Sequence, residues 1–361
     1  MFFEGDSVFY FFWNLIRATD LSEIFFLKLD YFSKNNITTL DFLHYLEQHH
    51  FKFNDEIIRR FIKQYDKSSG YKVKGNLSVH NNDDVYHYMV EVCYKKDNYY
   101  KVTLTNTANN HTQIILKNQD GVYVLTPSFN KSFKFQSDWP YDNSQIYLLD
   151  AIVKDIQNDK DLKFSFKNHK FVLQTKVKYP NNSKLIHQKI VLDDNCNLKK
   201  VVVYDKNGID CMNMVFDKIQ YSPKFSKDEF EIDSIMDSKE TDEVLETTSL
   251  EDVIYPLFLP DGTKLVNEEN IKKENGKRVI MNYDGEKSFL LVEEDADVFQ
   301  ELTIIPSSGE PIPVMDTMGI MTDNSLSWSS SGVDFYLVSD VMSIDEMVEV
   351  AQSIGVIASM K

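Results

Sequence analysis

The sequence "NQDGVYVLTPSFNKSFKFQSDWP" (residues 118–140) is typical of a β-hairpin. An Asp-Gly turn at 120–121 leads into the apolar residues 122–125, and a Thr-Pro-Ser corner precedes a second strand. In that strand Phe133 and Phe135 alternate with polar residues, so one of its faces is aromatic. The hairpin therefore either closes a core or presents an apolar surface to another molecule.

The composition is that of a folded chain rich in strands. With 361 residues, the length favours two domains, and 42% hydrophobic and 26% charged residues are ordinary for a globular protein. The 25 Phe and 19 Tyr are many, whereas the 12 Gly and 9 Pro are few. This mixture favours packed strands over disorder.

The charge argues against two classes of partner. A formal net charge of −17 repels the phosphates of nucleic acids and anionic lipid headgroups. We therefore predict no nucleic-acid binding. The charge leaves open the binding of acyl chains or of apolar peptide surfaces, because buried area sets the energy of those contacts.

No catalytic, cofactor or metal motif is present. Cys93, Cys196 and Cys211 form no Cys-x-x-Cys pair, and we expect them to be small buried residues within strands. His49 and His50 are adjacent near a helix end and would point about 100° apart, which makes them poor metal ligands. Glycine-rich phosphate loops and a Gly-x-Ser-x-Gly elbow are missing, and Ser329-Ser330-Ser331 is expected to be a polar loop. We predict no cofactor, no metal and no enzymatic activity.

The N-terminal region is predicted to be helical. Residues 7–18 are apolar but lack the basic start and small-residue cleavage site of an export signal, and they are too short to span a membrane. Thr38 or Thr39 can cap one helix, and Asn54 can cap a second that Gly70 ends.

From Tyr71 onward the hydrophobic pattern alternates with a period of two. Strands joined by short turns predict one large, strongly curved antiparallel sheet in which successive strands pair. One helix, within residues 143–159 and starting near Ser144, would lie across its concave face. In the C-terminal part, strands that include 302–307 are followed by a final helix with Ser343 and Glu346 as its capping box.

These patterns predict an α+β protein in four parts. Residues 1–54 form a helical extension, and residues 55–233 form an unclosed barrel with helices across its concave face. Residues 234–252 are an acidic linker, and residues 253–361 form a small α+β domain.

The concave face of such a sheet is the candidate binding site. If the helix covers it only partly, an apolar groove remains; alternatively the helix fills the concavity completely. The groove candidates are Tyr123, Leu125, Phe133, Phe135, Trp139, Tyr147 and Leu148.

The order of these elements resembles a known fold family. "DGVYVLTPSFNKSFKF", a helix, and strands ending in "MVFDKIQYSPKFSKDEFEI" are similar to the LolA/LolB-like carriers of outer-membrane lipoproteins. "SDWPYDNSQIYLL" and the C-terminal part resemble the sporulation and germination lipoproteins of the GerS or YdcC type. The resemblance implies an unclosed barrel with a helical lid and a non-enzymatic role at the cell envelope, although no acylated cysteine is recognisable here.

Two functions are considered, one from this resemblance and one from the aromatic-rich curved sheet. The preferred one is a sporulation or germination factor that docks on or regulates a cell-wall-processing enzyme. The alternative is a carrier or sensor that binds lipid or lipoprotein acyl chains in the groove. An edge strand would also allow a homodimer, and an enzymatic role is the least favoured.

Overall fold

The computed structural model describes residues 53–354 except 82–83, 137, 141–142, 168–169, 180–181, 238–249, 251, 274–275, 315–316 and 331. The predicted extension 1–54, with its histidines and its first helix, therefore lies almost entirely outside the described residues, as does most of the predicted acidic linker. The chain divides into two compact units. One comprises residues 1–67, 163–173 and 190–199, and the other comprises residues 68–162, 174–189 and 200–361. The four-part division of the sequence remains a prediction.

The first unit contains helix α4 (Phe53–Asp66), as the sequence predicts. Asp55 and Glu56 lie in its first turn, where the helix dipole favours negative charge, and Ile57 and Phe61 are fully buried. Cys196 belongs to the same unit but lies in a turn with a φ of 63°, so the expectation that it lies within a strand is wrong. The backbone N–H groups of this turn bond to the Asp193 carboxylate, which favours the turn over a continued strand.

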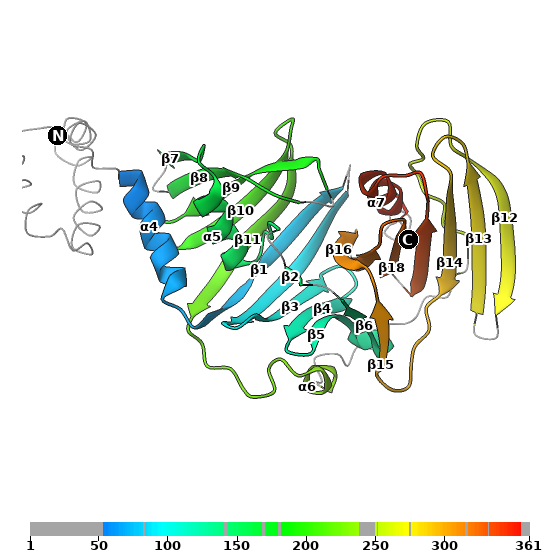
Figure 1. The fold of residues 1–361 in the computed structure, drawn as a ribbon, viewed down its shortest axis with the longest axis horizontal. Coiled ribbons are helices and arrows are strands. Elements are labelled where there is room, and N and C mark those ends of the chain that lie inside the picture. Colours follow the sequence, from blue (N-terminus) through cyan, green and yellow to red (C-terminus); the bar gives the residue numbers. More distant parts are fainter. Residues whose placement is uncertain are drawn as a thin grey trace, which may run out of the picture. The chain divides into compact units, whose positions relative to one another are not determined.

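The larger sheet has twelve strands (Figure 1). They are β1 (Gly70–Asn81), β2 (Asp84–Lys95), β3 (Tyr99–Asn106), β4 (Thr112–Asn118), β5 (Gly121–Thr126), β6 (Lys131–Phe135), β7 (Lys163–Lys167), β8 (Lys170–Lys176), β9 (Leu185–Leu192), β10 (Leu198–Asp205), β11 (Asp210–Tyr221) and β15 (Thr303–Ser307). A short 3-10 helix, η1 (Pro127–Phe129), forms the corner of the opening hairpin. The predicted curved, mainly antiparallel sheet is confirmed.

The strand order corrects the predicted pairing of every strand with its sequence neighbour. The order is β15-β6-β5-β4-β3-β2-β1-β11-β10-β9-β8-β7, so two runs of neighbouring strands meet where β1 pairs with β11. The break falls at α5 (Leu149–Asn158), the helix between β6 and β7. This connection is long enough to lead the chain to the other end of the strand order, whereas the short turns elsewhere keep consecutive strands adjacent.

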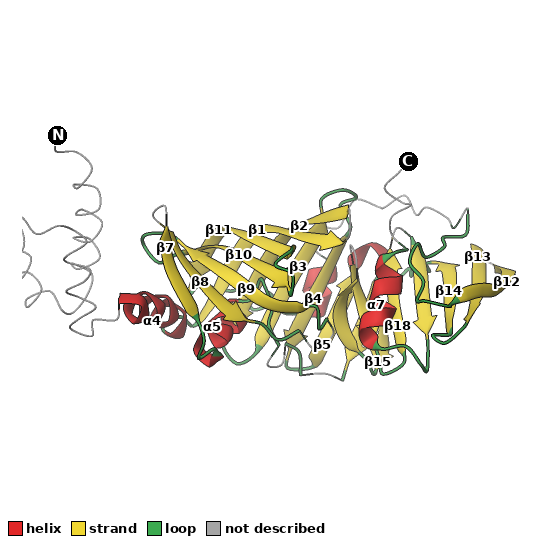
Figure 2. Ribbon diagram, turned by 90° about the horizontal axis from the view of Figure 1, so that it is seen from above, coloured by secondary structure: helices red, strands yellow, loops and turns green. Residues whose placement is uncertain are grey.

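Helix α5 lies against one face of this sheet, which we call the inner face (Figures 1 and 2). Leu149, Ile152, Val153 and Ile156 of α5 are buried. The helix begins at Leu149 and not near Ser144, because the Ser144 backbone N–H bonds to the carbonyl of Lys178, and its hydroxyl accepts from Lys178 N. These bonds hold the preceding segment against residues 177–178, outside a helix.

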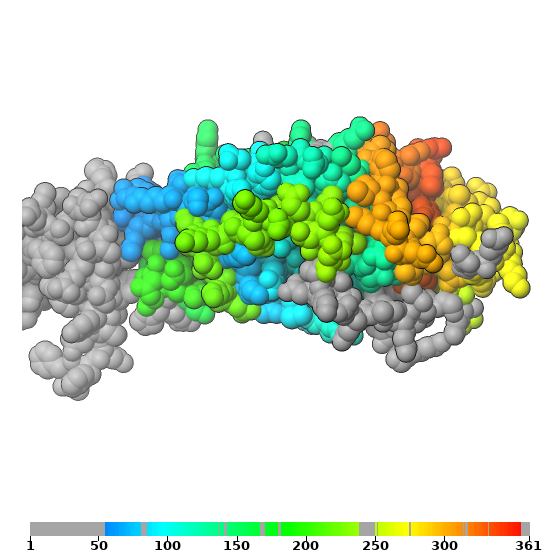
Figure 3. Space-filling view, turned by 90° about the horizontal axis from the view of Figure 1, so that it is seen from below, coloured from blue at the N-terminus to red at the C-terminus, as the bar shows by residue number. Residues whose placement is uncertain are grey.

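The opposite, outer face is covered by the chain that follows β11. Residues 222–237, which end in α6 (Ile232–Met236), cross the surface over the early strands (Figure 3, yellow-green). Phe230 and Ile235 pack there against Cys93, Ile114 and Leu116. Both faces of this part of the sheet are therefore buried.

The smaller sheet has seven strands in the order β12-β13-β14-β19-β18-β17-β16. They are β12 (Lys264–Lys273), β13 (Gly276–Asp284), β14 (Phe289–Asp295), β16 (Glu310–Val314), β17 (Thr317–Met321), β18 (Ser325–Ser330) and β19 (Val333–Val338). Ser329 and Ser330 lie in β18, so the expectation of a polar loop is wrong for these two residues.

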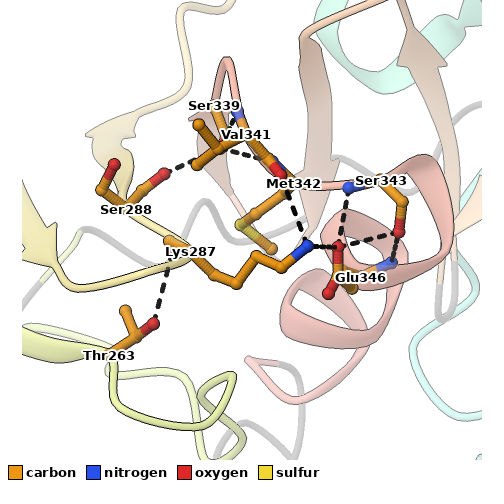
Figure 4. Close-up of polar contacts among 8 residues, drawn as sticks. All are labelled: Thr263, Lys287, Ser288, Ser339, Val341, Met342, Ser343 and Glu346. Carbon is orange, nitrogen blue, oxygen red and sulfur yellow. Dashed lines mark hydrogen bonds and ion pairs between the residues drawn. The ribbon is translucent and has the colours of Figure 1, made fainter.

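The final helix, α7 (Ile344–Gln352), packs on this sheet and has the predicted capping box of Ser343 and Glu346. Figure 4 shows that Lys287 also reaches this helix start: its Nζ lies 2.9 Å from Glu346 Oε2. The Ser339 hydroxyl donates to the carbonyl of Ser288 and accepts from Met342 N. These contacts fix the N-terminal end of α7 to the loop before β14.

Strand β15 corrects a second expectation, that residues 302–307 belong to the C-terminal sheet. Thr303–Ser307 instead pair in parallel with Lys131–Phe135 of β6, at the end of the larger sheet. The contact is extended by Thr303 N and Phe299 N, which donate to the carbonyls of Asn130 and Phe129. Without β15, one edge of β6 would have unpaired backbone N–H and C=O groups. A strand that lies beside this edge forms hydrogen bonds with them, which explains why residues 303–307 pair here.

Candidate functional site

The inner face of the larger sheet is held against α5 by a buried carboxylate. The Tyr71 hydroxyl donates to Asp150 Oδ1 at 2.6 Å and accepts from Leu149 N, and the Tyr100 hydroxyl donates to Asp150 Oδ2 at 3.0 Å. Burial raises the pKa of the Asp150 carboxyl, while the hydrogen bonds from Tyr71 and Tyr100 act in the opposite direction. The start of α5 is thereby anchored in the concavity.

A second carboxylate anchors the next turn of α5. Asp155 accepts hydrogen bonds from the Ser144 hydroxyl at 2.9 Å and from Gln188 Nε2 at 2.8 Å. Burial raises the pKa of Asp155 to about 6, although both of these bonds favour its charged form. Together the two carboxylates oppose removal of α5 from the sheet.

Beside α5 the inner face retains one apolar cavity of about 50 Å³. Strands of the larger sheet supply its floor, residues 145–147 and 179 supply one wall, and β17 of the smaller sheet closes it. The lining residues are Leu77, Val79, Tyr88, Leu104, Gln113, Gln145, Ile146, Tyr147, Tyr179, Met212, Thr317 and Met318.

The side chain of Gln113 in β4 bonds to the start of β17, where the cavity is closed. Gln113 Oε1 accepts from the Thr317 hydroxyl at 2.9 Å and from Met318 N at 2.5 Å. Gln113 is buried, so these bonds lie in a region of low polarity where an unpaired amide would be costly. The smaller sheet is thus part of the cavity wall.

Two tyrosines add polar groups to the cavity. Burial raises the pKa of both the Tyr147 and the Tyr179 hydroxyls, so both stay neutral. Tyr179 Oη lies beside the backbone of Ile146, but among the described residues it has no hydrogen-bond partner of normal geometry. A water molecule or a polar atom of a ligand could satisfy it.

The volume limits what the cavity can hold. A cavity that binds benzene measures about 150 Å³. The space of about 50 Å³ is a third of that benzene site, so it fits a few water molecules or the end of an apolar side chain and is too small for an acyl chain.

The predicted groove residues fall on different surfaces. Tyr147 lines the cavity. Trp139 packs edge-on against Tyr100 on the inner face, at a ring distance of 5.7 Å, and Leu148 is fully buried before α5. These three residues share the inner face.

The hairpin residues are divided by strand alternation. Phe133 pairs with Val124 and Phe135 with Val122, so both phenylalanines share a face with these valines. Tyr123 and Leu125 point the other way and pack under Phe230 and Ile235 on the outer face. The structure therefore does not bring all seven candidates into one groove.

Phe133 lies beside a buried ion pair that sequence reasoning did not predict. Lys131 Nζ lies 5.0 Å from the centre of the Phe133 ring and 3.0 Å from Asp334 Oδ2. These residues line a second cavity, of about 20 Å³, between β6 and the smaller sheet. Gln113, Thr317, Lys131 and Asp334 carry no local signal, because each acts through a partner about 200 positions away.

The described residues show neither a metal site nor a membrane-spanning helix. No group of three or more His, Cys, Asp or Glu side chains is arranged to hold a metal ion in the described part of the chain. Within the same ranges, no helix is long and apolar enough to cross a bilayer.

Solved structures that match this chain include two with low similarity scores. A chain of the Pseudomonas aeruginosa MucA/MucB complex covers 82% of this chain and 97% of its own length, with 12% identity and a TM-score of 0.30. A chain from the complex of the Clostridioides difficile CwlD amidase with the GerS lipoprotein covers 48% and 94%, with 19% identity and a TM-score of 0.19. TM-scores this low carry no argument about fold or function.

Sequence comparison is more decisive. No protein-family profile matches the chain. The sporulation protein YdcC of Bacillus subtilis (strain 168), however, is 37% identical over 305 residues, which cover 84% of this chain and 90% of that protein. This agrees with the expected YdcC type. The chain therefore belongs to the family of the sporulation protein YdcC.

Proposed function

We propose that this protein is a non-enzymatic sporulation factor of the cell envelope, and that it acts by docking on a protein that processes the cell wall. Its membership of the YdcC family supports the role in sporulation. The name of that relative refers to sporulation and to no catalytic activity. The enzyme class of the partner and the envelope location are part of the proposal.

One structural observation favours docking over lipid carriage: the inner face is filled. Helix α5 is anchored there by Asp150 and Asp155, and the remaining cavity measures about 50 Å³. A carrier needs space for acyl chains, whereas a docking protein needs only a rigid surface. Interaction surfaces outside the cavity therefore suit the fold better.

The test uses the full-length tagged protein in sporulating cells, with crosslinking before purification. We expect a peptidoglycan-processing enzyme to be enriched, and the purified pair to hydrolyse isolated peptidoglycan at a different rate from the enzyme alone. If no wall enzyme is recovered, or if the purified pair behaves as the enzyme alone does, the docking role is wrong.

A parallel measurement examines the lipid alternative. A hydrophobic dye should show no saturable binding that fatty acid or diacylglycerol displaces. If displacement is seen, Leu104→Phe, which fills the cavity, should reduce it, whereas an exposed change such as Lys264→Glu should not. Displacement with that pattern would favour the carrier function over docking.

A further inference from the structure

Strand β12 is an unusually exposed edge of the smaller sheet. It lies at the end of the strand order and pairs only with β13. All of its residues from Lys264 to Lys272 are exposed, or nearly so, including the apolar Leu265, Val266 and Ile271. One row of its backbone N–H and C=O groups is therefore available to another strand.

The sequence of β12 protects only part of this edge. A bulge lies at Val266, where the register with β13 shifts between Leu265 and Asn267. Bulges and lysines are common devices against edge pairing, and Lys264, Lys272 and Lys273 stand near the two ends of the strand. The run from Asn267 to Ile271 contains neither a lysine nor a proline.

We propose that a second copy of this chain pairs antiparallel with β12 about a two-fold axis at Ile271. A two-fold axis between antiparallel strands places one residue opposite its own copy. At Ile271 the register sets two isoleucines opposite each other and Glu269 opposite Lys273 at both ends. Opposite charges and apolar side chains in directly opposed positions stabilise strand pairs.

Two other symmetric registers pair the side chains less favourably. An axis at Glu269 places two carboxylates opposite each other, which is unfavourable. An axis at Asn270 pairs Glu268 with Lys272 but leaves Glu269 opposite Ile271. In the Ile271 register, moreover, Lys273 and Lys272, which would otherwise deter pairing, lie opposite Glu269 and Asn270 of the other copy.

The charges within one chain are also consistent with this register. Glu294 accepts from both Lys273 at 3.0 Å and Arg278 at 2.7 Å, so one carboxylate faces two cations. Glu269 makes no ion pair with any residue in the described ranges. Alternation places Glu269, Lys273, Arg278 and Glu294 on the same face of the sheet, because Ile271 pairs with Arg278 and Arg278 with Glu294. The partner's Glu269 would supply the negative charge that this group lacks.

The dimer should be weak and reversible. Five residue pairs along one edge bury less than the roughly 1,200 Å² of a standard stable interface. Association should therefore depend on protein concentration and weaken with added salt, which screens the exposed charge pairs.

Sedimentation equilibrium of the full chain tests this proposal. The wild type should show a monomer–dimer equilibrium, whereas Glu269→Lys alone and Lys273→Glu alone should shift it to monomer. An equimolar mixture of the two variants should recover the dimer, because each lysine then faces a glutamate. Lys264→Glu, a matched reversal outside the register, should leave the equilibrium unchanged.

Folding is checked by circular dichroism, because Lys273→Glu also removes the contact with Glu294. If that variant does not fold, Ile271→Glu replaces it, since it places two carboxylates opposite each other on an exposed position. A wild type that stays monomeric at high concentration overturns the proposal, as does a dimer that resists Glu269→Lys. The proposal is also wrong if Glu268→Lys alone and Lys272→Glu alone abolish the dimer and an equimolar mixture of the two restores it. That result would place the two-fold axis at Asn270.

Discussion

Lys131 Nζ and Asp334 Oδ2 form an ion pair of 3.0 Å, although 203 positions separate these residues in the sequence. Both side chains are almost fully buried, with exposures of 6% and 8%. Asp334 also accepts a hydrogen bond from the Ser329 hydroxyl. The pair connects β6 of the larger sheet to β19 of the smaller sheet, next to the parallel pairing of β15 with β6.

Removing one member of this pair should destabilise the protein strongly. Lys131→Met leaves the Asp334 carboxylate buried without its cation, which costs about 3–5 kcal/mol in comparable cases. The free energy of unfolding, measured in urea, should fall by that amount. The double variant Lys131→Met with Asp334→Leu should recover most of the loss, because no unpaired charge remains.

The exposed pair of Lys74 and Glu91 is the matched control. Its side chains are 61% and 52% exposed, so Lys74→Met should change the free energy of unfolding by less than about 1 kcal/mol. Equal effects at the two lysines would mean that the buried pair does not connect the sheets as described.

Glu293 should make stability depend on pH. Its side chain is buried, Ile254 N donates to Oε2 at 3.0 Å, and Oε1 has no hydrogen-bond partner among the described residues. Burial raises the pKa of Glu293 to about 7, from an ordinary value of 4.5, and the Ile254 bond opposes this only partly. The folded state therefore holds the proton more tightly than the unfolded state does.

It follows that the stabilising contribution of the protonated group is complete below pH 4.5 and is lost as the pH rises to about 7. Glu293→Gln should remove this loss and raise the free energy of unfolding above pH 7 by on the order of 3 kcal/mol. Denaturation at a series of pH values measures the difference between the two proteins.

Glu294 provides a control, because its pKa is shifted in the opposite direction to that of Glu293. Burial disfavours its charge, but hydrogen bonds from Lys273 and Arg278 hold its pKa below the ordinary value. Glu294→Gln should therefore destabilise the protein near neutral pH. If Glu293→Gln is also destabilising at pH 8, the account of Glu293 is wrong.

Gln113 should be required for closure of the cavity. Gln113→Ala leaves the buried Met318 N–H and the Thr317 hydroxyl without their acceptor, at a cost of about 1–3 kcal/mol for each buried group. We expect faster hydrogen exchange at the Met318 amide than in the wild type. Thr105→Ala is the control, because its hydroxyl bonds to Thr112 away from β17. Unchanged exchange at Met318 in Gln113→Ala would contradict this role.

Gly75 should be irreplaceable for a steric reason. A Cβ atom at this position would lie 2.2 Å from the carbonyl oxygen of Val215, at the bulge where β1 pairs with β11. Gly75→Ala should lower the free energy of unfolding by about 3 kcal/mol, as overpacking does in tight sites. At Gly208, with a φ of 80° and open space around it, alanine should cost only the 1–2 kcal/mol or so of a left-handed residue. Urea unfolding of both variants tests the contrast, and a smaller loss at Gly75 would contradict it.

Local sequence signals predicted most of the individual elements. The helix at Phe53–Asp66, the hairpin of β5 and β6, and the capping box of Ser343 and Glu346 depend on residues a few positions apart. For that reason the hydrophobic period, the turn residues and the caps were sufficient to predict these elements. The start of α5 was misplaced because Ser144 bonds to Lys178, a partner that its own segment does not reveal.

The candidate site could be predicted only in part. Alternation correctly separated Val122 and Val124 from Tyr123 and Leu125, but it could not say which face α5 would cover. Of the predicted groove residues, Tyr147 reaches the apolar cavity, and β17 closes that cavity through Gln113. Such contacts are set by how distant strands meet, which a period of two does not encode.

By itself the sequence determined the α+β class, the alternating strands, the helix caps and the relationship to YdcC-type proteins, because all of these depend on neighbouring residues or on similarity along the chain. The tertiary structure alone decided that β1 joins β11, that β15 completes the edge of β6 in parallel, and that Lys131 meets Asp334. Unpaired backbone groups and buried charges must find partners wherever the folded chain brings them close. That proximity is a property of the whole fold.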